Sequence, residues 1–157
     1  MELYFLRHGE AEPAGPGRSD EERSLTDRGR KQTLRVAQAL HRAGVRPDRI
    51  LTSPLRRARQ SGEILAEVLG VAAEADDRVL CSACTLGSVR TLISDHPGER
   101  LALVGHEPHC SRLVAQLAGG ASIHMGTGAA ARVDCERVEP GAGTLVWLIA
   151  PALLPVE

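Results

Sequence analysis

Short apolar runs alternate with longer amphipathic stretches along most of this chain. Residues 2–7 and 101–104 are nearly continuous apolar runs, which are typical of strands buried on both faces of a sheet. Between these runs, apolar residues recur at intervals of three and four from Asp27 to Gly44 and from Pro54 to Gly70. This spacing predicts two helices, the first capped by Thr26 and each ended by its glycine.

The remaining segments continue the same alternation. We expect a strand over residues 49–53, a further strand near 71–74, a helix between Leu86 and His96, a helix that opens at Pro108, and strands at about 130–138 and 144–150. Strands that alternate with helices of this length predict a three-layer α/β/α sandwich with a mostly parallel sheet. A chain of 157 residues has the size of one such unit, so we expect a single domain that spans residues 1–157.

Composition and charge exclude several classes of protein. Hydrophobic residues make up 43% and charged residues 25% of the chain, as in ordinary globular proteins, whereas aromatic residues make up only 2%. With so few aromatic side chains and a formal net charge of -1, the chain offers neither a stacking platform nor a basic field to nucleic acid. Its first residues do not form a secretory signal, and no apolar run approaches the ~20 residues that cross a membrane. We therefore predict a cytoplasmic protein without nucleic-acid or membrane partners.

The four cysteines are Cys81, Cys84, Cys110 and Cys135. In a cytoplasmic protein such thiols are usually unbridged and buried, and this is the interpretation we adopt. Cys81 and Cys84 form a C-x-x-C pair, so a metal-binding or redox role for that pair stays open as the alternative.

Cationic or potentially cationic side chains follow three of the predicted strands. Arg7 and His8 come at the end of the first strand, His106 follows a second strand, and Arg56 and Arg57 follow a third. Because ligands of open parallel sheets bind at the carboxyl ends of the strands, we expect these groups to converge at one edge of the sheet. The sequence therefore predicts the outline of a phosphate site.

Four motifs appear in a fixed order across about two thirds of the chain. They are Leu6-Arg7-His8-Gly9-Glu10, Leu25-Thr26-x-x-Gly29-x-x-Gln32, Ser53-Pro54-Leu55-x-Arg57-Ala58-x-Gln60 and Val104-Gly105-His106-x-Pro108. Any one of them is a weak signal, but the ordered set resembles the histidine phosphatase superfamily, which has the phosphoglycerate-mutase-like fold. The short chain and the R-H-G-E-A opening resemble the SixA-type phosphohistidine phosphatases more than the larger mutases and phytases.

The resemblance implies a role for four residues. His8 would attack phosphorus through an unprotonated ring nitrogen, while its other ring nitrogen donates to a backbone carbonyl. Arg7, Arg57 and a protonated His106 would surround the transferring phosphoryl group. Arg57 is chosen over Arg56 because it directly precedes the alanine of the matching motif, and we expect Arg56 to face solvent. Such a pocket needs no metal and no cofactor.

One feature of the larger family members is missing. They carry a glutamate general acid in a segment inserted after the second helix, and none of the acidic residues in 74–78 matches it. An alkoxide needs that proton, whereas an imidazole leaves well once its nitrogen is protonated. The missing acid therefore favours a phosphohistidine in a protein, such as a phosphorelay domain, as the substrate. A small phosphate ester is the alternative substrate, and a non-catalytic module that binds a phosphorylated partner is a third interpretation.

The other histidines are given structural interpretations. His41 lies late in a helix and His96 lies at a helix end, where an imidazole commonly caps exposed carbonyls. His106, His109 and Cys110 could imitate metal ligands, but the expected helix start points His109 away from the pocket and no carboxylate pair completes the set. No metal site is predicted.

The first predicted helix carries a run of basic residues, namely Arg28, Arg30, Lys31 and Arg35. The default interpretation of such a run is a solvent-exposed helix face. An acidic partner that binds this face is the alternative.

Overall fold

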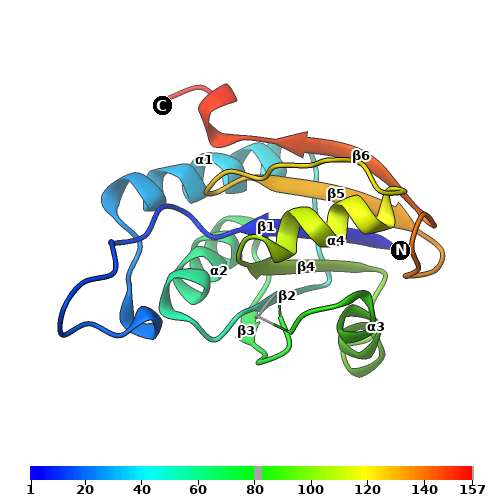
Figure 1. Ribbon diagram of the computed structural model, residues 1–157. Helices are drawn as coiled ribbons and strands as arrows, with labels where there is room; N and C mark the ends of the chain where they lie inside the picture. Colours follow the sequence, from blue (N-terminus) through cyan, green and yellow to red (C-terminus); the bar gives the residue numbers. More distant parts are fainter. Residues whose placement is uncertain (80–82, 157) are drawn as a thin grey trace.

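The computed structural model describes residues 1–79 and 83–156, and within them six strands form one mixed sheet (Figure 1). Across the sheet the order is β3-β2-β4-β1-β5-β6. The strands are β1 (Glu2–Arg7), β2 (Arg49–Thr52), β3 (Ala73–Ala75), β4 (Arg100–Gly105), β5 (Ala130–Cys135) and β6 (Gly143–Ile149). The first four strands in this order pair in parallel, and β5 pairs antiparallel with both β1 and β6.

Helices cover both faces of this sheet (Figure 1). They are α1 (Asp27–Arg42), α2 (Arg56–Leu69), α3 (Leu86–Asp95) and α4 (His109–Leu117), with short 3-10 turns η1 (Asp20–Glu22) and η2 (Pro151–Leu153). Buried residues of α1 and α2 pack in one core against one face of the sheet, and those of α3 and α4 pack in a second core against the other face. The predicted three-layer α/β/α sandwich with a mostly parallel sheet is therefore confirmed.

Strand β1 shows why its sequence is apolar throughout. Leu3 and Phe5 belong to the core beneath α3 and α4, whereas Tyr4 and Leu6 belong to the core beneath α1 and α2. Each of these four side chains is at most 4% exposed. Full burial of such a side chain contributes roughly 1.5–3 kcal/mol, so the apolar run fixes β1 in the middle of the sheet.

Local signals set the ends of α1 and α2. The side chain of Thr26 accepts a hydrogen bond from the Gly29 backbone N–H, as expected of an N-cap. Gly70 ends α2 in the left-handed conformation, with φ of 70°. The start of α2 was placed too early, at Pro54, because the Ser53 N–H still bonds to the Val104 carbonyl at the end of the strand pair. The chain therefore turns before the helix begins at Arg56.

Two strands also differ in length from the sequence-based expectation. The short edge strand lies at Ala73–Ala75, slightly later than expected. Strand β5 ends at Cys135, where its N–H reaches the Met1 carbonyl and its partner strand runs out. Cys110 and Cys135 are buried thiols, while Cys81 lies outside the described residues and leaves the C-x-x-C pair untested. No helix in the described part of the chain is long and apolar enough to cross a membrane.

Candidate active site

His8 stands at the carboxyl end of β1, one residue beyond the strand, and is only 8% exposed. Its Nδ1 lies 2.6 Å from the carbonyl oxygen of Gly9. A carbonyl oxygen can only accept, so Nδ1 carries the proton and donates to it. Nε2 therefore keeps the lone pair, which is the form that a nucleophilic imidazole requires.

A hydrogen bond from Arg57 to the other ring nitrogen of His8 supports the same tautomer. The Arg57 Nε–H donates to His8 Nε2 over 3.3 Å, and Arg57 is 7% exposed, whereas the neighbouring Arg56 is exposed. Successive residues on a helix point about 100° apart, which is why one arginine enters the site and the other faces solvent. The structure confirms the expectation that Arg56 faces solvent, while Arg57 is buried.

The carboxyl end of β4 brings His106 to the same place. The His8 and His106 rings have centroids 5.0 Å apart, and His106 Nε2 lies 2.7 Å from the hydroxyl of Ser53 at the end of β2. Arg7 donates from Nη1 to the Met125 carbonyl over 3.1 Å. The structure thus gathers the four predicted site residues at one edge of the sheet.

Two polar atoms of this site are buried without a hydrogen-bond partner among the described residues. They are Arg7 Nε and His106 Nδ1. An unpaired buried polar atom costs about 1–3 kcal/mol, and such exceptions concentrate at sites that bind a ligand. A tetrahedral oxyanion between the arginines and the imidazoles would supply acceptors for both atoms once His106 Nδ1 carries a proton.

Burial and neighbouring cations keep both imidazoles neutral. Burial is the largest cause that lowers the pKa of His8 to about 4, and the guanidinium groups of Arg57 and Arg7 lower it further. Burial likewise lowers the pKa of His106 to about 3, with smaller contributions from His8 and Arg57. This value does not agree with the sequence-based expectation of a protonated His106. The negative charge of a bound phosphate would raise the pKa of His106 toward that form.

Glycines in two of the motifs bring the loop after β1 against the start of α1. A Cβ on Gly9 would lie 2.3 Å from the Gly29 carbonyl oxygen, and one on Gly29 would lie 2.0 Å from the Glu10 carbonyl oxygen. Neither position therefore accepts a side chain. The Glu10 N–H donates to Gln32 Oε1 over 2.9 Å, which fixes the same loop and the ring of His8 above it.

Ser61 and the motif residue Gln60, both on α2, hold the site from the other side. The Ser61 hydroxyl accepts from the Gly9 N–H over 3.2 Å and donates to the Arg57 carbonyl over 2.9 Å. Gln60 accepts from the Leu25 N–H over 2.7 Å. These residues touch no reacting group, and they position the loops that carry His8 and Arg57.

Sequence reasoning missed Asp20, a residue of η1. Its carbonyl accepts from Arg57 Nη1 over 2.8 Å, and its carboxylate accepts from Arg57 Nη2 over 3.1 Å. Hydrogen bonds from Arg23 and then from Arg57 hold the pKa of Asp20 below its usual range. Asp20 sits in a polar loop without periodicity, so no pattern in the sequence placed it at the site. The contact of Ser53 with His106 was also missed, although Ser53 belongs to a recognised motif.

The carboxylates after β3 are engaged elsewhere. Asp76 accepts two hydrogen bonds from the Arg78 guanidinium, and this interaction holds the pKa of Asp76 well below its usual range. Asp76 also lies 3.3 Å from His96 Nε2, while His96 Nδ1 lies 3.1 Å from Glu74. His96 is the C-cap of α3 but its ring pairs with these carboxylates, so the simple capping interpretation was incomplete.

The remaining candidates fall outside the site. His41 is exposed on α1, and His109 Nδ1 lies 2.7 Å from Arg112 Nη2 on the surface of α4. Cys110 is fully buried, and burial raises the pKa of its thiol. Within residues 1–79 and 83–156, no group of three or more His, Cys, Asp or Glu side chains is placed to hold a metal ion.

Comparisons with known proteins agree with this geometry. The model of the histidine phosphatase superfamily (branch 1) matches residues 3–80. The phosphohistidine phosphatase SixA of Escherichia coli (strain K12) is 31% identical over 159 aligned positions, which cover 98% of this chain and 96% of that protein.

Solved structures give the same result for the fold. The protein histidine phosphatase SixA complexed with tungstate matches with a TM-score of 0.83 and 28% identity, over 97% of this chain and 98% of that one. A mycobacterial glucosyl-3-phosphoglycerate phosphatase shares the fold with a TM-score of 0.70 and 20% identity, over 92% of this chain and 96% of that one. This chain belongs to the histidine phosphatase superfamily, and its relatives include the SixA-type phosphatases.

Proposed function

We propose that this protein hydrolyses phosphohistidine in a phosphorylated protein, with His8 as the nucleophile and a covalent phosphohistidine as the intermediate. The observation that carries the proposal is the pair of hydrogen bonds on the His8 ring, in which Nδ1 donates to a carbonyl and Nε2 accepts from Arg57. A ring held in this tautomer keeps its lone pair beside a guanidinium group that can bind the phosphate. Similarity to a phosphohistidine phosphatase over nearly the whole chain supports the substrate class.

The reaction proceeds in two displacements at phosphorus. In the first, His8 Nε2 attacks, the bond between phosphorus and the substrate imidazole breaks, and that protonated ring leaves as neutral imidazole with the bonding electron pair. In the second, water attacks phospho-His8, the new nitrogen–phosphorus bond breaks, and inorganic phosphate leaves. His8 recovers its lone pair and one water is consumed. No metal or cofactor enters this balance of atoms and electrons.

Arg7, Arg57 and His106 stabilise the charge that spreads over the equatorial oxygens during each displacement. The two guanidinium groups are suited to bidentate contacts with phosphate oxygens. The negative charge of a bound phosphate raises the pKa of His106 from its value of about 3 in this pocket and so favours the cationic form of the ring.

The carboxylates near the site favour an imidazole leaving group over an alkoxide. Asp20 and Asp76 both have pKa values below the usual range because arginine side chains bind them. A carboxylate that stays ionised is a poor proton donor. An imidazole with a pKa near ~6.5 leaves without such a donor, whereas an alkoxide does not.

We also place the reaction in the cytoplasm. Cys110 and Cys135 are unbridged thiols, which is typical of a reducing compartment. A phosphorylated signalling protein of that compartment would be the natural partner.

The test is turnover of a chemically phosphorylated histidine protein beside p-nitrophenyl phosphate and glycerol phosphate. We expect kcat/KM for phosphohistidine to exceed that for the alkyl ester by on the order of 10² or more, because Asp20 and Asp76 stay ionised and neither can protonate the alkoxide. Comparable turnover of glycerol phosphate would replace this proposal with a phosphatase for small esters. Binding of the phosphorylated protein without turnover of any substrate would leave only a phosphate-binding module.

A further inference from the structure

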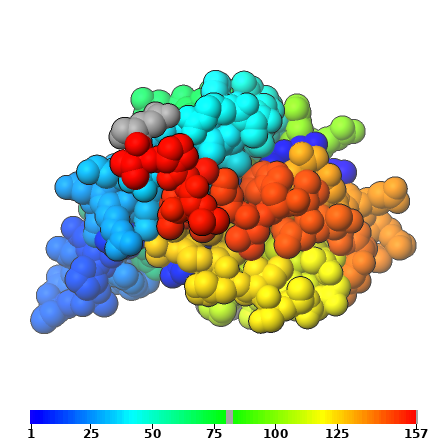
Figure 2. All heavy atoms as spheres, turned by 90° about the horizontal axis from the view of Figure 1, so that it is seen from above, coloured from blue at the N-terminus to red at the C-terminus, as the bar shows by residue number. Residues whose placement is uncertain are grey.

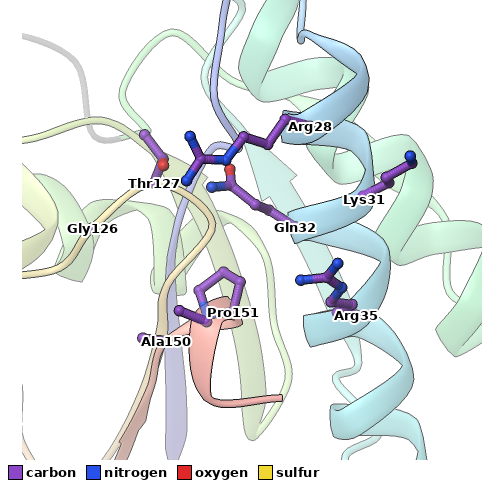
Figure 3. A pocket seen from close by; sticks show the side chains of 9 residues that line it. Arg28, Lys31, Gln32, Arg35, Gly126, Thr127, Ala150 and Pro151 are labelled. Atoms are coloured by element: carbon purple, nitrogen blue, oxygen red, sulfur yellow. The ribbon is translucent and has the colours of Figure 1, made fainter. Parts of the chain in front are cut away.

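A cavity of about 440 Å³ lies beside the candidate active site, and its lining includes none of Arg7, His8, Arg57 and His106. Helix α1 forms one wall with Arg28, Lys31, Gln32 and Arg35, and Gly126, Thr127 and residues 150–152 form the other (Figure 3). In Figure 3, Arg28 reaches from α1 toward Thr127, and Arg35 lies further along the helix near Pro151. Figure 2 shows the C-terminal segment in red against α1 in light blue, and residues 150–152 of that segment line the cavity.

The wall formed by α1 is basic and carries no acidic side chain. Lys31 and Arg35 have no ion-pair or hydrogen-bond partner among residues 1–79 and 83–156, while Arg28 is paired with Glu10 over 3.2 Å. The chain as a whole has a formal net charge of -1, so this concentration of positive charge is local. Arg28, Arg30 and Lys31 are all exposed, but Arg30 does not line the cavity, so the interpretation of a plain solvent-exposed face is sufficient for Arg30 alone.

The cavity and the active site share a segment of backbone. The Gly128 N–H donates to the His8 carbonyl over 2.9 Å, and the Met125 carbonyl accepts from Arg7 over 3.1 Å. Gly126 and Thr127, which line the cavity, lie between these two contacts. The basic wall and the His8 site are therefore joined through residues 125–128.

We propose that this cavity and the basic stripe of Arg28, Lys31 and Arg35 form a docking surface for an acidic face of the phosphorylated protein substrate. The proposal rests on the proposed function and adds the charge of the partner. At a rise of 1.5 Å per residue, the three positions extend over roughly 10 Å of helix axis, which suits a row of carboxylates rather than one small anion. Opposite charges on such a row steer encounter and fix orientation, and their effect weakens as salt screens them.

The test uses two phosphohistidine peptides of equal length, one flanked by glutamates and the other by glutamines. The wild-type protein should show kcat/KM on the order of 10-fold higher for the glutamate peptide, through a lower KM, because two or three exposed ion pairs each contribute a few-fold. The Lys31→Glu, Arg35→Glu double variant should lose this preference and keep its turnover of p-nitrophenyl phosphate. Arg30→Glu, on the same helix outside the cavity, is the matched control and should keep the preference.

Equal kcat/KM for the two peptides in the wild type, or an equal loss in Arg30→Glu, would overturn the docking surface. If the double variant loses turnover of p-nitrophenyl phosphate, the neutral Lys31→Gln, Arg35→Gln variant separates a folding defect from a charge effect.

A second readout keeps the docking surface separate from the proposed function. Binding of the unphosphorylated glutamate peptide to the wild type, absent in the double variant, would uphold the docking surface even if neither phosphopeptide were hydrolysed. No such binding would overturn it. Displacement of that peptide by millimolar inorganic phosphate in a His8→Ala, Arg57→Ala background would instead assign the cavity to a small anion.

Discussion

Two charged clusters lie at the carboxyl edge of the same sheet, and their surroundings give them different chemistry. In the His8 cluster, formed by Arg7, His8, Arg57 and His106, burial and, to a smaller extent, nearby positive charge keep the imidazoles neutral. In the Asp76 cluster, formed by Asp76, Arg78 and His96, the Asp76 carboxylate forms an ion pair with Arg78 and stays ionised.

The difference shows how burial and the partners of an arginine together set the chemistry of a cluster. Burial first, and the charges of Arg57 and Arg7 second, lower the pKa of His8 and leave it a lone pair for reaction. In the Asp76 cluster, Arg78 instead forms an ion pair with the carboxylate. Asp20 shares features of both clusters, because its half-exposed carboxylate forms an ion pair with Arg57.

The largest expected effect is on the nucleophile. His8→Ala should reduce kcat by on the order of 10⁴ or more with the fold unchanged, because no other described group in the pocket offers a lone pair at the same place. Rapid-quench trapping of the wild type should find acid-labile phosphate on His8. The control is His96→Ala in the Asp76 cluster, which should keep kcat within about threefold of the wild type. Turnover by His8→Ala at the wild-type rate would end the proposal.

The second-largest expected effect is the difference in kcat/KM between variants of the adjacent residues Arg56 and Arg57. Arg57→Ala should lose on the order of 10² or more in kcat/KM, because the guanidinium binds both the nucleophile and the charge that develops on phosphate. Arg56→Ala removes an exposed side chain one position earlier and should cost less than about threefold. Steady-state kinetics with p-nitrophenyl phosphate measure both, and equal losses would show that the buried position of Arg57 has no catalytic meaning.

The sequence predicted the fold and the four residues of the His8 cluster for definite physical reasons. The apolar run of β1 and the caps at Thr26 and Gly70 are local signals, and each of them appears in the structure. His8 and Arg57 were predicted because their motifs are contiguous in the chain. Asp20 was not predicted, because its position over Arg57 depends on how a polar loop folds back across the sheet edge.

The protonation state of His106 was also not predicted correctly from the sequence. The residue type suggests a cation beside phosphate, but its pKa follows from burial and from the cations packed around it. These are properties of the folded pocket. Likewise, the basic run on α1 is visible in the sequence, but only the fold divides it into Arg35 inside a cavity and Arg30 outside it.

The pH dependence of kcat/KM, which reports the free enzyme, should distinguish the buried imidazoles from ordinary ones. His8 is active when neutral, so the rate should fall only as the pH drops through its pKa of about 4, rather than through the usual value near 6.5. The free energy of unfolding should change with pH in the same direction as the rate. Between those two values the unfolded chain binds protons that the folded chain does not, so the free energy of unfolding falls as the pH is lowered. Measurements of kcat/KM and denaturant titrations between pH 4 and 8 test this, and an acid limb of kcat/KM near 6.5 would contradict it.

A smaller effect is expected at Asp20. Asp20→Asn removes the carboxylate that competes with a phosphate for Arg57, while the backbone carbonyl contact stays. The inhibition constant for vanadate should therefore fall by a factor of about three to ten, which matches one partly exposed ion pair. The comparison variant is Glu21→Gln, a charge removal in the same turn with no contact to Arg57. A large loss of kcat in Asp20→Asn would instead assign Asp20 to proton transfer.

The smallest effect should come from the Asp76 cluster, and it tests whether a general acid exists after β3. Asp76 is held ionised by Arg78, so Asp76→Asn should change turnover of p-nitrophenyl phosphate and of an alkyl phosphate by less than about threefold each. The ratio of the two rates is the informative quantity, because a lost proton donor would slow the alkyl ester far more than the activated aryl ester. Asp77→Asn, one residue further along, is the matched control. A selective collapse of alkyl turnover in Asp76→Asn would make that carboxylate the missing acid and favour a phosphate monoester as the substrate.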